Sequence, residues 1–207
     1  MSRSEWKFES RYVVISRENI DTDQIIPARF LTTTSRSGLG PHAFHDWRYA
    51  KDGSLNPEFP LNRREAAGAR VLVAGSNFGC GSSREHAVWA LLDAGFKSIV
   101  SSQFADIFRS NALNNGLLPL QVSPEMLAML MNAVSADSIS PTVSVDLEAG
   151  TFRVAEGIET SFVIPSFARY CMLNGMDEMQ FLVSSLSKIT RYESSHPCTV
   201  DTVDATR

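Results

Sequence analysis

Cysteine is scarce in this sequence, and its placement argues against several classes of protein. The chain holds 3 cysteines, Cys80, Cys171 and Cys198, and no Cys-x-x-Cys pair. An odd number of widely spaced thiols is not the pattern of a disulfide framework, a structural zinc site or a self-contained iron–sulfur cluster. The sequence therefore argues against a protein that is stabilised by disulfides or by its own metal cluster.

Long apolar runs and basic runs are also missing. No segment approaches the ~20 apolar residues of a membrane-spanning helix, and no apolar stretch of a signal peptide follows the first residues. The formal net charge is -4 without a basic cluster, which argues against nucleic acid as a partner. We therefore expect a cytoplasmic protein that binds neither a membrane nor nucleic acid.

What is present is a core of alternating strands and helices. Hydrophobic residues make up 43% of the chain, and short apolar runs alternate with helical patterns. We predict strands at 12–15, 71–73, 98–100, 117–120, 142–147, 151–154 and 160–164, and helices at 41–48, 87–94, 104–115, 124–134, 166–174 and 176–186. Residues 19–27 are predicted as a loop entering a short strand or turn, and 28–40 as a mobile loop. The pattern indicates an α/β fold.

The stretch from Ala74 to His86 stands out, because a glycine-rich turn lies between a predicted strand and a predicted helix. Its three glycines allow a close approach to a ligand, and the helix start offers unpaired N–H groups to an anion. Arg84 can bind a carboxylate through a bidentate pair of hydrogen bonds. The turn lacks the lysine of a phosphate-binding loop. A purely structural alternative is that Ser82-x-x-Glu85 only forms a capping box.

Other candidate groups have a structural alternative of their own. Asp21 and Asp23 are either paired carboxylates for acid–base chemistry or a turn and helix cap. His42, His45 and Asp46 form at best a weak metal motif. His86 either orients the site or packs. Further candidates are Cys80, whose pKa a helix start would lower, and Cys171, which is typical of a core thiol.

Four motifs in order resemble the small subunit of 3-isopropylmalate dehydratase, a branch of the aconitase superfamily. They lie at 19–27, 79–86, 104–112 and 171–177, and the resemblance runs from about Phe8 to Tyr192. It implies a swivelling β/β/α domain like the fourth domain of aconitase, over residues 1–193. Residues 194–207 are polar and lack periodicity, which predicts a disordered tail. It also implies a separate large subunit that carries a [4Fe–4S] cluster, with no metal bound by this chain.

The resemblance also implies roles for single residues in the isomerisation of 2-isopropylmalate to 3-isopropylmalate for leucine biosynthesis. Ser82 matches the serine that takes a proton from carbon as its alkoxide, and Asp23 an acid beside the active site. Arg84 and Ser83 match substrate-binding residues. A loop arginine of the site corresponds to Arg36, with Arg29 as the competitor.

Two alternatives remain open at this point. The chain is also similar to small subunits of sister hydro-lyases, namely homoaconitase and the citraconate and dimethylmalate dehydratases, which differ in loop 28–40. The second alternative is a non-catalytic anion-binding module in which Ser82 merely caps a helix.

Overall fold

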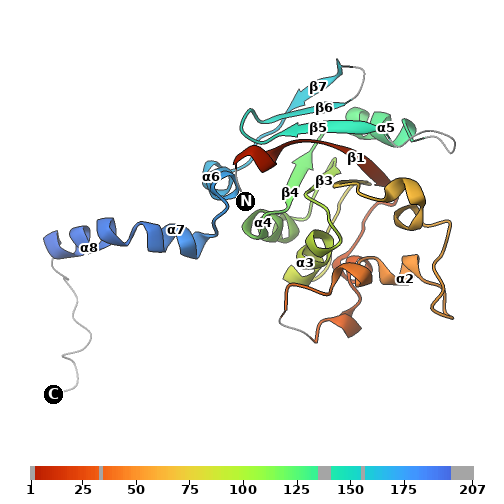
Figure 1. Ribbon diagram of the computed structural model, residues 1–207, viewed down its shortest axis with the longest axis horizontal. Helices are drawn as coiled ribbons and strands as arrows, with labels where there is room; N and C mark the ends of the chain where they lie inside the picture. The colour runs from red at the N-terminus through yellow and green to blue at the C-terminus, as the bar shows by residue number, and fades with distance from the viewer. Residues whose placement is uncertain (1–2, 33–34, 135–140, 155–156, 197–207) are drawn as a thin grey trace.

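A seven-stranded mixed sheet organises the computed structural model, which describes residues 3–32, 35–134, 141–154 and 157–196. The strand order is β4-β3-β2-β1-β5-β6-β7 (Figure 1). Strands β1 to β4 run parallel, and β5 to β7 continue from β1 as an antiparallel meander. The bounds are β1 Lys7–Ile15, β2 Val71–Ala74, β3 Ser98–Ser101, β4 Leu118–Gln121, β5 Thr142–Asp146, β6 Thr151–Val154 and β7 Glu159–Ser161. The predicted α/β fold is confirmed.

Helices cover both faces of the parallel half of the sheet. Their bounds are α1 Thr22–Ile25, α2 His45–Arg48, α3 Glu85–Asp93, α4 Asp106–Asn115, α5 Pro124–Asn132, α6 Ser166–Asn174, α7 Glu178–Ser184 and α8 Leu186–Ser195. Figure 1 shows α5 beside the antiparallel strands, and α7 and α8 extending away from the sheet. No helix in the described ranges is long and apolar enough to span a membrane.

Alternate residues of β2 enter two separate hydrophobic clusters. Leu72 and Ala74 pack with residues of α1, α3 and α4 on one face. Val71 and Val73 pack on the other face with residues of α5, α6 and the meander. Because both faces are covered, the parallel strands are continuous apolar runs in the sequence rather than alternating ones. This burial explains why the strand at 71–73 is recognisable without the structure.

Elements with strong local signals form where they are predicted. The hairpin of β5 and β6 is antiparallel as expected. Helix α5 begins at Pro124 with Ser123 as its N-cap, whose side chain accepts the Met126 amide. Gly116 and Gly175 end α4 and α6 in the left-handed conformation. Serine caps, N-terminal prolines and C-terminal glycines are local physical signals, so the sequence alone is enough to place them.

Several predicted boundaries are wrong. Strand β1 begins at Lys7 rather than at residue 12, and its first half alternates exposed and buried residues as it pairs with β5. Residues 41–48 split into a 3-10 turn, Gly40–His42, and the short α2. The segment predicted as one helix at 176–186 becomes α7 and α8, which reach Ser195. Residues 194 and 195 of the predicted tail are therefore helical, and residues 197–207 of it lie outside the described ranges.

Candidate active site

Three loops at one edge of the sheet meet around the glycine-rich turn. They follow the carboxyl ends of the parallel strands β1, β2 and β3, the edge where open α/β sheets bind ligands. The Asn19 amide in the first loop donates to the Ser76 carbonyl at 2.9 Å, and the Phe78 amide donates to the Gln103 carbonyl of the third loop at 3.0 Å. The turn is therefore held by its neighbours on both sides.

The glycines at two positions of this turn make room for protein atoms. A Cβ on Gly75 would lie 2.2 Å from the Arg17 carbonyl oxygen, and a Cβ on Gly79 would lie 2.2 Å from Cγ of Phe108. Gly79 also has a φ of 77°, a conformation that L residues rarely adopt. The prediction that these glycines admit a ligand is wrong at both positions, because the adjoining loop and α4 already fill the space.

Gly79→Ala is expected to lower the free energy of unfolding by about 3 kcal/mol, because overpacking against Phe108 adds to backbone strain. Gly53 is the matched control. It has a φ of 82°, and a Cβ there would meet nothing within 4 Å, so Gly53→Ala should cost only the strain, about 1 kcal/mol. Urea unfolding of both variants measures the difference. Equal losses would contradict the close packing at Gly79.

Helix α3 does not begin with a serine cap. Arg84 occupies the N-cap position in extended conformation, and it makes no side-chain capping hydrogen bond. The predicted capping box of Ser82 and Glu85 is therefore wrong, because the helix starts later than the motif suggests. Ser82 and Ser83 precede the helix, and both are exposed. Their hydroxyls lie on an open surface rather than closing the end of α3.

The first loop contains a short helix that the sequence did not reveal. Asp21 is the N-cap of α1 and forms a capping box with Gln24, with hydrogen bonds of 2.8 and 3.0 Å. This confirms the structural alternative for Asp21 as a helix cap. Thr22 follows at the first helical position, and its hydroxyl donates to the Ser82 carbonyl at 2.9 Å. The sequence analysis did not single out Thr22, because no local pattern shows that a threonine between two aspartates contacts the turn around Ser82.

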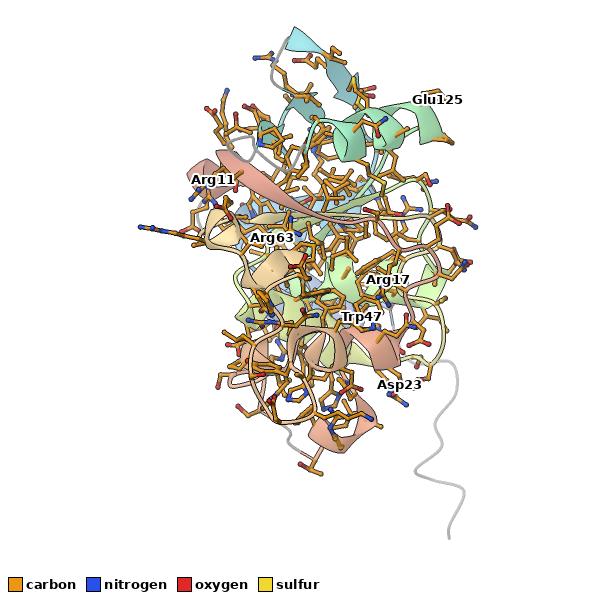
Figure 2. All side chains as sticks on the ribbon, turned by 90° about the vertical axis from the view of Figure 1, so that its right-hand side faces the viewer. Arg11, Arg17, Asp23, Trp47, Arg63 and Glu125 are labelled. Carbon is orange, nitrogen blue, oxygen red and sulfur yellow. The ribbon has the colours of Figure 1, made fainter. Side chains whose placement is uncertain are left out.

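Asp23 and Arg84 form an ion pair across the two loops. The Asp23 side chain is 54% exposed and that of Arg84 is 23% exposed. Figure 2 places Asp23 toward the same end of the molecule as Trp47 of α2, opposite Glu125 of α5. Three predicted site residues, Asp23, Ser82 and Arg84, are therefore brought together from segments that are about sixty residues apart in the chain.

The two candidate loop arginines lie elsewhere in this structure. Arg36 stands over Trp89 of α3, with its guanidinium carbon 5.4 Å from the ring centroid. Further along the same loop, the Gly40 amide donates to Asp93 at 2.6 Å, near the end of α3. These contacts place Arg36 at the middle of α3 and Gly40 at its end.

Arg29 belongs to a separate surface cluster. It forms an ion pair with Asp46 and contacts Nδ1 of His45 at 3.0 Å, and the Arg29 hydrogen bond holds the pKa of Asp46 below its usual value. His42 stacks on Phe30 with ring centroids 4.0 Å apart. Burial lowers the pKa of His42. These residues are linked to one another and not to Ser82.

No group of three metal-ligating side chains is found within the described ranges. The described residues therefore offer no set of ligands for an iron–sulfur cluster. His86 packs against Trp89, with ring centroids 4.6 Å apart. Cys171 is buried, as predicted for a core thiol, and Cys198 lies outside the described residues.

The pKa of the Cys80 thiol is raised rather than lowered, in contrast to the prediction from its position before a helix. Burial, and secondarily the charge of Asp21, raise the pKa of Cys80. The expected lowering is wrong because α3 begins at Glu85, well beyond the cysteine, while Asp21 pairs with Cys80 in a parallel bridge. The site therefore offers hydroxyls and a guanidinium, and no thiolate, at an open edge of the sheet.

The sheet, the turn and the paired loops define a class of protein. The model of the aconitase C-terminal domain matches residues 9–125. A solved structure of 3-isopropylmalate dehydratase from Methanocaldococcus jannaschii has a TM-score of 0.65 and 26% sequence identity, covering 90% of this chain and 99% of that one. The fold is therefore an aconitase-type swivel domain.

Curated relatives narrow the class. The 3-isopropylmalate dehydratase small subunit of Anaeromyxobacter dehalogenans is 55% identical over 89% of this chain and 94% of the relative. The protein of the same name from Chloroflexus aggregans is 50% identical over 93% of this chain and 94% of the relative. The chain belongs to the family of 3-isopropylmalate dehydratase small subunits, which confirms the resemblance predicted from the sequence.

Proposed function

We propose that this chain is the small subunit of a cytoplasmic hydro-lyase that interconverts 2-isopropylmalate and 3-isopropylmalate through 2-isopropylmaleate in leucine biosynthesis. It works with a large subunit that carries a [4Fe–4S] cluster, in a heterodimer or a higher assembly. The observation that supports this most directly is the exposed Ser82, which lies beside the Asp23–Arg84 pair at the open edge of the sheet. The names of the relatives point to the same reaction.

In this proposal Ser82 is the base. Its alkoxide accepts the proton from the substrate carbon and becomes a hydroxyl, while the hydroxyl group leaves from the neighbouring carbon. The electron pair of the broken carbon–hydrogen bond forms the double bond of 2-isopropylmaleate, and the proton stays on Ser82. The hydroxyl leaves as hydroxide, which the Lewis-acid cluster of the large subunit would accept. Rehydration with the two positions exchanged gives the isomer. The guanidinium of Arg84, two residues further along the turn, would favour the charged form of the serine.

Arg84 and Ser83 bind a carboxylate of the substrate. The guanidinium is already held at the site by Asp23, so little ordering of its long side chain remains to be done on binding. Arg36 is assigned to the substrate as well. In this structure it lies over Trp89, so its contact with the substrate stays a prediction.

Reconstitution tests the proposed function. The isolated chain is expected to show no turnover of 2-isopropylmalate, and addition of the large subunit loaded with its cluster should restore it, because each subunit holds half of the site. Formation of the unsaturated diacid is followed by ultraviolet absorbance. Turnover by the isolated chain would refute the proposal. A panel of homoaconitate, citramalate and dimethylmalate would identify a sister hydro-lyase if one of them were preferred.

The alternative of a non-catalytic module has lost its main support. It required Ser82 to act as a helix cap, and the N-cap position is occupied by Arg84 without a capping bond.

A further inference from the structure

Thr22 donates two hydrogen bonds to the turn that contains Ser82. Its amide donates to the Cys80 carbonyl at 2.9 Å, and its hydroxyl donates to the Ser82 carbonyl at 2.9 Å. The residue is almost completely buried, with 2% exposure. Two carbonyls of the turn are thus fastened to one residue of α1.

The shape of the turn keeps this contact close. Gly81 has a φ of 92°, and a Cβ there would lie 3.3 Å from Cβ of Asp21 and 3.6 Å from Oγ1 of Thr22. A Cβ at this position would crowd Asp21 and would reach van der Waals contact with Thr22. Glycine thus leaves the closest packing of the turn against the start of α1 undisturbed.

The two hydroxyls are also near each other. Oγ1 of Thr22 lies 3.4 Å from Oγ of Ser82, which is longer than an ordinary hydroxyl–hydroxyl hydrogen bond. A small rotation of the exposed Ser82 would close the gap, and such contacts often tighten only when substrate is bound. Thr22 has one proton, which it gives to the Ser82 carbonyl, so its lone pairs can accept the proton of Ser82.

We propose that Thr22 is a positioning residue for Ser82. It holds the turn in place through its amide and hydroxyl, accepts a hydrogen bond from the neutral serine, and turns its own proton toward the serine oxygen when that oxygen is ionised. Donation to the charged form lowers the pKa of a hydroxyl. The inference rests on the proposed role of Ser82 as the base.

The test compares Thr22→Val, which has nearly the same shape without the hydroxyl, with Thr22→Ser, which keeps it. Both are reconstituted with the cluster-loaded large subunit, and complex formation, kcat, KM and the pH profile of kcat are measured. For Thr22→Val we expect kcat to fall about tenfold or more and KM to stay within about threefold. The rising limb of the pH profile should move to higher pH, because the serine oxygen has lost a donor.

Thr22→Ser is expected to keep a pH profile close to that of the wild type, which a merely structural role of the threonine would not require. If Thr22→Val has a normal kcat and pH profile while Ser82→Ala is inactive, the role of Thr22 is refuted and the proposed function stands. If Ser82→Ala remains active, the proposed function itself fails. Should Thr22→Val not assemble, Thr22→Ala replaces it, and failure of both to assemble would show a role in folding alone and overturn the inference.

Discussion

Ser82→Ala in the reconstituted enzyme is expected to lower kcat by about 10³-fold or more, which is the order of effect of a lost general base. The reason is that two other candidate bases at the turn, Cys80 and Asp23, are poorly suited to accept the proton. Cys80 has a raised pKa, and Asp23 is engaged with Arg84. Steady-state turnover of 2-isopropylmalate measures the loss.

Assembly and stability should survive this substitution. Ser82 is exposed, and its hydrogen bond to α1 uses the backbone carbonyl, which alanine retains. Size-exclusion chromatography with the large subunit is therefore expected to show an unchanged complex. Ser102→Ala, in the neighbouring loop after β3, is the matched control and should keep normal turnover. Comparable losses in the two variants would mean that serine removal at this edge acts through structure rather than chemistry.

Arg84→Lys is expected to lower kcat/KM by about 100-fold, mainly through KM. Lysine keeps the positive charge but lacks the planar guanidinium, so a bidentate pair of hydrogen bonds to the carboxylate is replaced by a single charged contact. The stability of the free chain should change by less than about 1 kcal/mol, because the Asp23–Arg84 pair lies at the surface where ion pairs contribute little. Steady-state kinetics over a range of substrate concentrations separates KM from kcat.

Arg11→Lys is the control for this charge-conserving change. Arg11 donates to the Ala67 carbonyl at 2.6 Å, and Figure 2 shows it well away from Asp23. Its replacement should leave both kinetic constants near their wild-type values. If Arg84→Lys also leaves KM unchanged, Arg84 does not bind a substrate carboxylate.

The parts of the fold that could be predicted are those with local causes. The buried strand at 71–73 is apolar on both faces because helices cover both faces of the sheet. The start of α5 is marked by Ser123 and Pro124, and its capping bond is made within four residues. By contrast, α1 is only one turn long, too short for helical periodicity to appear in its sequence.

The candidate site was predictable as a set of residue types and not as an arrangement. The motifs named Asp23, Ser82 and Arg84, which the structure brings together. They also suggested a capping box that does not form, and the assignment of Arg36, which lies over Trp89, stays a prediction. The position of an arginine on a long loop depends on which helix face the loop follows, and no spacing in the chain contains that information.

The sequence by itself determined the family, the alternating core and the chemical groups at the glycine-rich turn, because each of these depends on residue types over short stretches. Only the tertiary structure decided that Thr22 lies against Ser82, that Gly75 and Gly79 accommodate protein rather than ligand, and that Cys80 is a weaker acid than usual. These properties come from contacts between loops that follow different strands, so their physical cause is the sheet that aligns the strand ends.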